Sequence, residues 1–495
     1  MEVIFAVGFD DQLGRYGRAL RDLRAGDVVI DEFPFACGPK SGTEIVCLVC
    51  CQPIDYSSKD AKCPQCRWPV CKLCWNSNIH SGECKVFRNA KAPFGAGVDS
   101  KNRCPQLECI TPLRVLLEKE KHPERWDREV EPMEYHDEAR RGFQEIWNAD
   151  LINIARYLRG PCKLSRFSEE LIMRVVGILQ VNAFEAKTPQ GHPIRCLFPQ
   201  TAILAHNCVP NTIRTIYPSE DYRIKLRTLV DVKKDEQLFV SYTFTLDGTA
   251  ERQQHLKNGK YFTCRCERCC DPTELGSYFS SLICEDCDSG YISTINPLDN
   301  SSDWKCNKCE CVIPSSKINA ILDPIQDEVA VVEAMPYSDM RLQQTERLHR
   351  KYHHILHPLH FIQTNLRQSL THMYGRVKGY ELVTLPDSVL EYKIDLCRLV
   401  LKVLDIFEPG LSRSRATALY ELYGPLALIA HKLYLCKMID ATIYRSRLGE
   451  AISVLQEAVT ILENEDSLSP EGVLAVVGKK ALEQLREAML AIDRN

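Results

Sequence analysis

Closely spaced cysteine and histidine residues are the feature of this sequence best suited to chemistry. Cysteine pairs separated by two residues recur along the chain, and the two thiolates of such a pair can hold one edge of a tetrahedral Zn²⁺ ion. Sixteen cysteine and histidine residues that could bind zinc fall into three blocks. The first block contains Cys47, Cys50, Cys63, Cys66, Cys71, Cys74, His80 and Cys84. The other two contain Cys208, Cys264, Cys266 and Cys269, and then Cys284, Cys287, Cys306 and Cys309.

These ligands predict four structural zinc ions. Eight, four and four ligands divide into four complete sites, and a complete site leaves no position for a reactive water molecule. We therefore look for chemistry between the blocks. The chain has 25 cysteines, and repeated pairs at this spacing are typical of an intracellular metal-binding protein. The ten other cysteines are interpreted as free thiols, and three of them are alternative ligands: Cys51, Cys270 and Cys311.

Composition excludes several classes of protein. The formal net charge of −4 argues against broad non-specific binding of nucleic acids. No apolar run approaches the roughly 20 residues that a membrane helix needs. The first residues lack the basic start of a secretory signal, so we expect no signal peptide. A chain of 495 residues exceeds one hydrophobic core, which predicts about three domains.

Hydrophobic periodicity gives an outline of the elements. Short strands are expected within residues 1–46, and residues 101–180 have helical stripes such as Leu151, Ile154, Ala155 and Leu158. Strands are expected again at 194–198, 223–230 and 238–242. Beyond residue 317 the apolar residues follow a 3.6-residue period, as in packed helical hairpins, and Ser469 followed by Pro470 is a predicted helix start.

Three stretches then point to a known family. They are LAHNCVPN at 204–211, DEQLFVSY at 235–242 and YFTCRCERC at 261–269. Their order and spacing resemble a SET domain with its post-SET zinc, and the first cysteine block resembles an inserted MYND finger. Together they resemble the SET-and-MYND (SMYD) family of protein-lysine methyltransferases. Further stretches are similar to its arthropod-type SmydA branch, at 14–16, 21–34, 110–117, 177–185 and 356–366.

The resemblance implies an α+β fold in which a MYND zinc finger splits the SET β-fold. We predict a SET N-terminal part (1–46), a MYND-type finger (47–84), a helical insert (85–180), a SET core (181–245), a post-SET segment (246–272), a zinc ribbon (273–316) and an all-α TPR-like domain (317–495). In the family pairing, Cys47, Cys50, Cys71 and Cys74 hold one ion. Cys63, Cys66, His80 and Cys84 hold a second, and Cys208 joins the post-SET cysteines around a third.

The resemblance also implies chemistry. Tyr242 matches the catalytic tyrosine, which orients a lysine amine toward S-adenosylmethionine (SAM). The cofactor-binding positions are Gly14, Arg15, Tyr16, His136, Ala205, His206, Tyr242 and Phe262. Each of these residues could also have a purely structural role. Tyr242 could be a half-buried strand tyrosine, Phe262 could be an ordinary packing residue, and His136 could be an exposed helix histidine.

Several positions depart from the family pattern and leave a second function open. Ala205 stands where the family has asparagine, Tyr16 where its loop has the second glycine, and Gln237 where it has glutamate. Each lost hydrogen bond costs ~0.5–3 kcal/mol. The alternative is therefore a weak or inactive zinc scaffold that acts in transcriptional or chromatin regulation through protein contacts.

The expected partners follow from the same resemblance. They are a protein lysine as the methyl acceptor and proline-containing peptides at the MYND finger. We expect no membrane attachment, no strong sequence-specific nucleic-acid binding, a monomeric state, and a location in the cytoplasm and nucleus.

Overall fold

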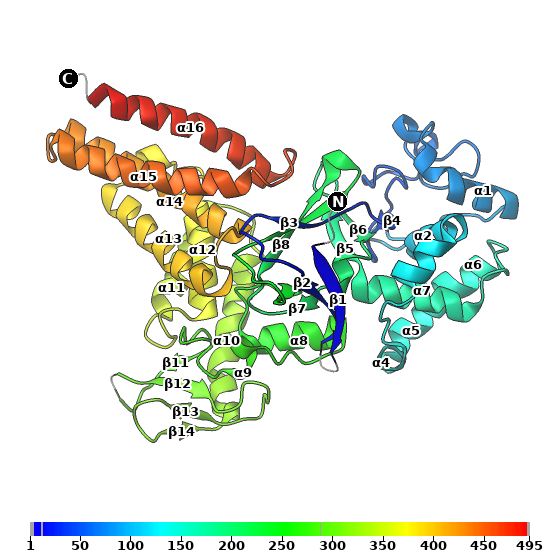
Figure 1. Ribbon diagram of the computed structural model, residues 1–495, viewed down its shortest axis with the longest axis horizontal. Helices are drawn as coiled ribbons and strands as arrows, with labels where there is room; N and C mark the ends of the chain where they lie inside the picture. Colours follow the sequence, from blue (N-terminus) through cyan, green and yellow to red (C-terminus); the bar gives the residue numbers. More distant parts are fainter. Residues whose placement is uncertain (1–3, 11–12, 288, 493–495) are drawn as a thin grey trace.

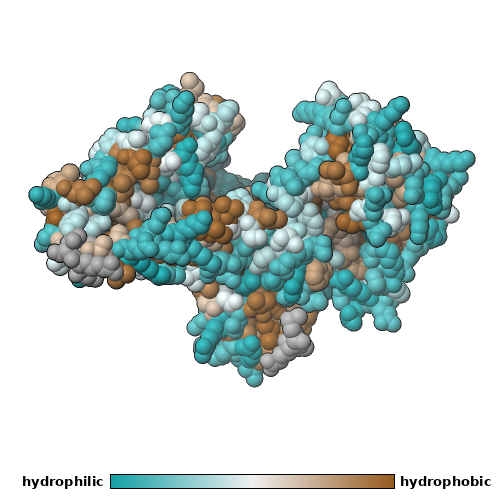
Figure 2. All heavy atoms as spheres, turned by 90° about the horizontal axis from the view of Figure 1, so that it is seen from above, coloured by the Kyte–Doolittle hydropathy of each residue, from teal (hydrophilic) through white to brown (hydrophobic). Residues whose placement is uncertain are grey.

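A central set of small β-sheets separates two helical regions (Figure 1). The computed structural model describes residues 4–10, 13–287 and 289–492. The strands of the first 240 residues lie in the middle of Figure 1, with the MYND region and helices α1–α7 on one side and α11–α16 on the other. Viewed from above, a broad recess lies between these two sides (Figure 2). The predicted α+β class is confirmed.

Three sheets join the beginning of the chain to residues that follow the zinc finger and helical insert. The first has the order β1 (Phe5–Asp10), β2 (Gly14–Ala19), β10 (Gln237–Val240) and β7 (Ala205–His206). The second has the order β3 (Val28–Glu32), β9 (Arg223–Thr228) and β8 (Thr212–Tyr217). The third has the order β4 (Ala36–Pro39), β6 (Pro193–Leu197) and β5 (Phe184–Lys187). The SET core is therefore discontinuous in sequence.

Alternating side chains explain the central strands. In β9 the residues Ile224, Leu226 and Thr228 are buried, and the residues between them are partly exposed. Such a period of two buries one face of a strand. Strand β5 was missed by the sequence reading, because its four residues FEAK have too short an apolar pattern to distinguish a strand.

The inserted region is mostly helical. Its helices are α1 (Ser81–Ala90), α2 (Ile110–Lys121), α3 (Pro123–Arg125), α4 (Asp137–Arg141), α5 (Gln144–Asp150), α6 (Tyr157–Arg159) and α7 (Glu169–Asn182). Ser168 caps α7 by accepting a hydrogen bond from the Leu171 backbone N–H. The stripe that predicted a regular helix at 151–158 contains a π-helical turn, Leu151–Arg156, yet Ile154, Ala155 and Leu158 are buried as expected.

A zinc-ribbon sheet and a helical array form the rest of the chain. The sheet contains β11 (Leu282–Ile283), β12 (Tyr291–Thr294), β13 (Trp304–Cys306) and β14 (Val312–Ile313). Helices α8 (Thr249–Lys260) and α9 (Glu267–Cys270) precede it. The array contains α10 (Ser315–Glu333), α11 (Asp339–Lys351), α12 (Phe361–Met373), α13 (Asp387–Phe407), α14 (Arg413–Leu435), α15 (Ala441–Leu462) and α16 (Pro470–Ile492). Every described helix is too short or too polar to cross a membrane.

Close backbone contacts hold the helical array against the SET core. Gly410 has φ +74°, and a Cβ atom there would lie 2.1 Å from the Leu229 carbonyl oxygen. The next residue, Leu411, donates its N–H to that same oxygen at 2.9 Å. Glycine is needed here because both the conformation and the approach exclude a side chain. Ser469 accepts from the Gly472 N–H at 3.0 Å, which confirms the predicted start of α16.

A buried charge network fastens the MYND finger to the SET core. His80 places its Nδ1 2.8 Å from Glu83, a carboxylate whose side chain is only 1 % exposed. Arg114 of α2 binds both oxygens of Glu83, and it also donates to the carbonyls of Cys37 in β4 and of Leu48 in the finger. A carboxylate behind a ligating histidine fixes the orientation of its ring. One arginine thus joins the finger, α2 and β4.

Glu83→Gln should lower the free energy of unfolding of the zinc-loaded protein by ~3–5 kcal/mol, because Arg114 stays buried without a counter-charge. Glu120→Gln is the matched control, since it breaks the exposed Glu120–Arg166 pair and should cost at most ~1 kcal/mol. Urea unfolding followed by circular dichroism measures both. Equal losses in the two variants would contradict this role of Glu83.

Candidate active site and metal centres

The four cysteines Cys208, Cys264, Cys266 and Cys269 come together at the edge of the central sheets. Their sulfur atoms all lie within 4.8 Å of one another, as tetrahedral metal ligands require. Two buried arginines surround them. Arg252 of α8 directs Nε at the Cys208 sulfur at 3.3 Å, and Arg268 lies beside it; Glu274 pairs with both arginines at 3.1 and 3.0 Å. A cluster of four thiolates around Zn²⁺ carries net negative charge, which the arginine beside it offsets.

The segment that carries Cys208 runs alongside strand β10. Strands β7 and β10 pair in parallel, with Ala205 opposite Phe239 and His206 opposite Val240. The Asn211 side chain also binds this strand: its Nδ2 donates to the Gln237 carbonyl at 2.8 Å and its Oδ1 accepts from the Phe239 N–H at 2.7 Å. An amide side chain therefore takes the place of a missing strand residue. The geometry sets the end of β10, and hence Tyr242, relative to β7.

Tyr242 is held at three points. Its backbone N–H donates to His206 Nδ1 at 3.0 Å, its hydroxyl donates to the Leu204 carbonyl at 2.6 Å, and its ring stacks on the His206 ring with centroids 5.3 Å apart. Burial raises the pKa of Tyr242 to about 12, so its hydroxyl stays protonated at neutral pH. Tyr242 also contacts both the SET core and the cysteine cluster. A fixed phenol therefore stands at the junction of these two parts.

His206 links Tyr242 to the metal centre. Burial lowers the pKa of His206 to about 4, so the ring is neutral. Because Nδ1 accepts the Tyr242 N–H, the ring proton lies on Nε2, which is 3.2 Å from the Cys208 sulfur. The sequence analysis placed His206 among the cofactor contacts. That contact stays a prediction, and the side chain lies between the tyrosine and a metal ligand, a position that only the three-dimensional structure reveals.

The predicted cofactor loop lies in the hairpin of β1 and β2. Gly14 has φ +69°, and the Tyr16 ring lies against Gly8 of the neighbouring strand, where a Cβ atom would be 2.5 Å from it. A Cβ atom on Gly17 would be 2.3 Å from the Leu204 side chain. The Leu204 side chain therefore fills the space beside Gly17 that a ligand could otherwise occupy. Ala205 is 5 % exposed and fills its position beside β10.

The other predicted cofactor residues gather near the end of α8. His136 takes a left-handed conformation before α4, and its ring lies 5.5 Å from that of Tyr261. It is half-buried rather than an exposed helix residue, and burial lowers its pKa. Arg15 is close enough to Glu134 for that carboxylate to oppose the lowering of the Arg15 pKa by burial. Phe262 packs against the cysteine cluster, with its ring 6.1 Å from that of His206.

Tyr242 also lines a large cleft. Its volume is about 1600 Å³, and it is lined by the SET core and by the helical array. Phe184, Tyr242 and Lys260 contribute from the core, and Glu408, Asp466 and Glu471 from the array side. Arg214 also lines the cleft and donates to the Ser241 carbonyl at 3.3 Å.

Lys260 is a site residue that the sequence analysis missed. Its Nζ lies 5.1 Å from the centroid of the Tyr242 ring and donates to the carbonyl of Val181. Burial, assisted by the nearby Arg214 charge, lowers the pKa of Lys260 to about 8. The available signal was its place directly before the YFTC stretch, because Tyr261 and Phe262 were already assigned near the cofactor.

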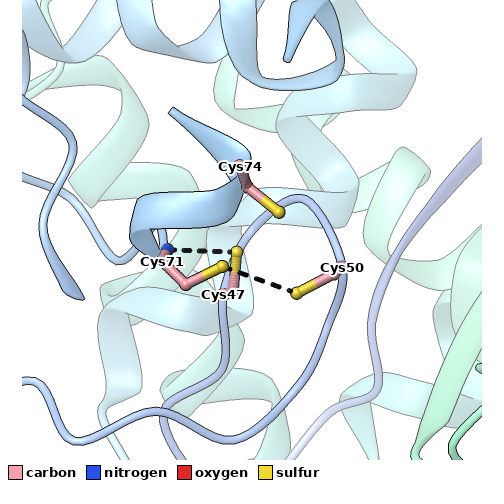
Figure 3. Close-up of side chains that lie close together, drawn as sticks. All are labelled: Cys47, Cys50, Cys71 and Cys74. Carbon is pink, nitrogen blue, oxygen red and sulfur yellow. Dashed lines mark hydrogen bonds between the residues drawn. The ribbon is translucent and has the colours of Figure 1, made fainter. Parts of the chain in front are cut away.

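The remaining predicted ligands form three further clusters. Figure 3 shows Cys47, Cys50, Cys71 and Cys74 around one point, with the Cys71 N–H 3.3 Å from the Cys47 sulfur. Cys63, Cys66, His80 and Cys84 form a second cluster, and Cys284, Cys287, Cys306 and Cys309 a third. A Cβ atom on Gly290 would lie 2.4 Å from the Cys306 sulfur, so this ribbon turn needs glycine. Cys51, Cys270 and Cys311 lie outside the four clusters.

Comparisons with known proteins agree with this geometry. Residues 14–243 match the family model of the SET domain. The chain is 31% identical over 315 residues to the SET domain-containing protein SmydA-8, isoform A, of Drosophila melanogaster, covering 62% of this chain and 64% of that protein. It is 23% identical to the N-lysine methyltransferase SMYD2 of Rattus norvegicus and 26% identical to the histone-lysine N-methyltransferase SMYD1 of Homo sapiens. These two matches cover 52% of this chain, and 58% and 54% of those proteins. The chain thus spans less than two thirds of the length of these relatives.

The purified protein should contain four Zn²⁺ ions per chain, because the sixteen ligands form four complete clusters. Cys208→Ser should retain three ions and melt at a lower temperature, since structural zinc binding contributes to folding free energy. Cys436→Ser is the control, because that thiol is exposed and outside the clusters. Elemental analysis by mass spectrometry measures the content. Two ions or fewer in the unmodified protein would contradict the assignment.

Acylation of Lys260 should be half-maximal near pH 8, because the neutral amine reacts and burial lowers its pKa to about 8. Labelling with a trace of acetic anhydride across a pH series, read by peptide mass spectrometry, measures this. The exposed Lys257 of the same helix is labelled in the same samples as a reference. A midpoint near the ordinary lysine value of 10.5 would contradict the buried position of the amine.

Proposed function

Because the chain belongs to the SET-and-MYND (SMYD) family, in its SmydA branch, we propose that it methylates lysine side chains of histone or non-histone proteins. The observation that carries this proposal is the placement of Tyr242, whose protonated hydroxyl donates to the Leu204 carbonyl and which lines a large cleft. A site that combines an aromatic ring with a carbonyl oxygen suits an amine and a positively charged methyl donor.

The residues near Tyr242 that were predicted to bind the cofactor suit S-adenosylmethionine. When bound, this cofactor supplies an electrophilic methyl group on a sulfonium ion. Arg15 offers a cation for its carboxylate, Phe262 an aromatic face for its adenine, and the Leu204 carbonyl with the Tyr242 ring a partner for its positive charge. The Gly14–Tyr16 hairpin and His136 border the same region. The donor set therefore fits the cofactor.

Tyr242 is suited to orient the acceptor. A lysine amine attacks only as the neutral form, so it must lose a proton to solvent before it enters. The phenol oxygen of Tyr242, whose own proton points at Leu204, can then accept an N–H of the amine. This leaves the nitrogen lone pair free to point at the methyl donor. Positioning of this kind, without covalent or metal chemistry, is what the transfer requires.

The cleft and the finger support protein substrates and partners. Two acidic side chains from the array side, Glu408 and Glu471, line the cleft and favour a lysine-rich segment. On the MYND finger, Leu73 is 96 % exposed and Ile79 is 62 % exposed. Exposed apolar side chains on a rigid zinc finger suit an apolar, proline-containing peptide. We further propose a monomeric protein that works in the cytoplasm and nucleus.

A catalytically inactive scaffold is the second candidate, favoured by two observations. Ala205 provides no amide for the cofactor, and Leu204 occupies the space beside Gly17. Calorimetry with S-adenosylmethionine separates the two functions. A protein that does not bind millimolar cofactor would be the scaffold, and one that binds it but never transfers the methyl group would also contradict the methyltransferase.

Tyr242→Phe should lower the rate of methyl transfer on the order of 10²-fold, because the hydroxyl that orients the amine is lost. Its affinity for S-adenosylmethionine should change by about twofold or less, since the phenol acts mainly during transfer. Tyr157→Phe is the matched control, because that hydroxyl also donates to a backbone carbonyl, Pro93, far from the cleft. Radiolabelled transfer to core histones and calorimetry measure the two effects. Equal turnover in the Tyr242 and Tyr157 variants would remove Tyr242 from the site.

A further inference from the structure

We propose that Lys260 is a built-in occupant of the acceptor site, where its ammonium group stands in the place of the substrate lysine and competes with it. The inference rests on the proposed function, because it takes the Tyr242 face of the cleft to be the acceptor site. This amine belongs to the protein itself. It comes from the last residue of α8 in the same chain.

Two contacts define the position of the Lys260 ammonium. Its Nζ lies over the Tyr242 ring, 5.1 Å from the centroid, and donates to the Val181 carbonyl. Val181 is in the last turn of α7, which ends at Asn182. Carbonyls in the last turn of a helix lack intrahelical partners and carry the negative end of the helix dipole. The ammonium is therefore bound between an aromatic face and a carbonyl oxygen.

These contacts are the ones that an acceptor lysine would need. A lysine side chain presents a four-carbon stem and a cationic or neutral amine, and aromatic rings with carbonyl oxygens bind both forms. Phe184, Val181 and Tyr242 line the same cleft as Lys260. The Lys260 amine lies over the Tyr242 ring within this cleft, so a lysine that binds against the same ring meets it. Two amines cannot share this site, because they would need the same ring face and the same carbonyl oxygen.

Lys260 is not held there by an ion pair. Among the described residues, no carboxylate contributes to the pKa of Lys260, whereas the Arg214 charge helps to lower it. An ordinary surface lysine with neither counter-ion nor obstacle would turn its amine into water. The Lys260 amine can therefore leave the site when a stronger ligand binds, so it competes with that ligand and does not block the site permanently.

The first experiment tests the site without any turnover. n-Butylammonium has the same stem and charge as a lysine side chain, and saturation-transfer NMR detects its binding. Lys260→Ala should bind it at least about tenfold more tightly than the unmodified protein, because the resident amine is gone. Lys257→Ala is the matched control, since Lys257 lies on the same helix but is exposed. Equal binding by all three proteins would overturn the proposal, even if the protein is an active methyltransferase.

The second experiment measures methyl transfer to core histones at saturating cofactor. Lys260→Ala should lower the KM for the histone at least about fivefold, as removal of a competitor does, while Lys257→Ala matches the unmodified protein. An unchanged or raised KM overturns the competition. Should Lys260→Ala fail to fold, Lys260→Met keeps the stem without the charge and gives the same comparison. If no protein transfers methyl groups but n-butylammonium binds only to Lys260→Ala, the proposed function fails and the occupied amine site stands.

Discussion

The attachment of residues 204–211 to β10 is the constraint on which the rest of the site depends. Asn211 replaces two strand hydrogen bonds along β10, and Cys208 brings the segment together with cysteines more than fifty residues further along the chain. Leu204 and His206, which hold Tyr242, both belong to this segment. The hydroxyl, the ring and the backbone of Tyr242 are therefore oriented by one short stretch. Displacement of this segment from β10 would release all three contacts at once.

Buried arginine–glutamate networks recur beside the metal clusters. Arg114 and Glu83 support His80 in the MYND finger, and Arg252, Arg268 and Glu274 surround the cluster of Cys208. In both places a buried cation has a carboxylate partner, because an unpaired buried charge is very costly. Arg268 also stacks on Phe407 of α13, so the second network reaches the helical array. Lys260 is the contrast, since its amine enters the site with a carbonyl and a ring instead of a carboxylate.

The departures from the family pattern take on physical meaning in the hairpin of β1 and β2. Tyr16 packs across Gly8, and Gly17 makes room for Leu204, whose carbonyl receives the Tyr242 hydroxyl. The glycine that could have approached a cofactor instead allows two strands to pack closely. Ala205 is buried beside them. We therefore propose that cofactor affinity in this protein depends on Arg15, Phe262 and backbone groups more than on side-chain amides.

The family resemblance supplied the α+β class, the pairing of the ligands into four sets and the place of Cys208 among them. The sequence by itself determined the sixteen ligand residues and the helical C-terminal region. It could do so because cysteine spacing and hydrophobic period are local, and each reports on geometry within a few residues. The strand β5, the π-helical turn at 151–156 and the role of His206 were decided only by the tertiary structure. So was Lys260, because its significance comes from Tyr242 and Val181, which are distant in sequence. Contacts between distant segments leave no periodic pattern in the sequence. Only the folded structure decides how deeply such an amine is buried and which charges lie near it, and these two factors set its pKa.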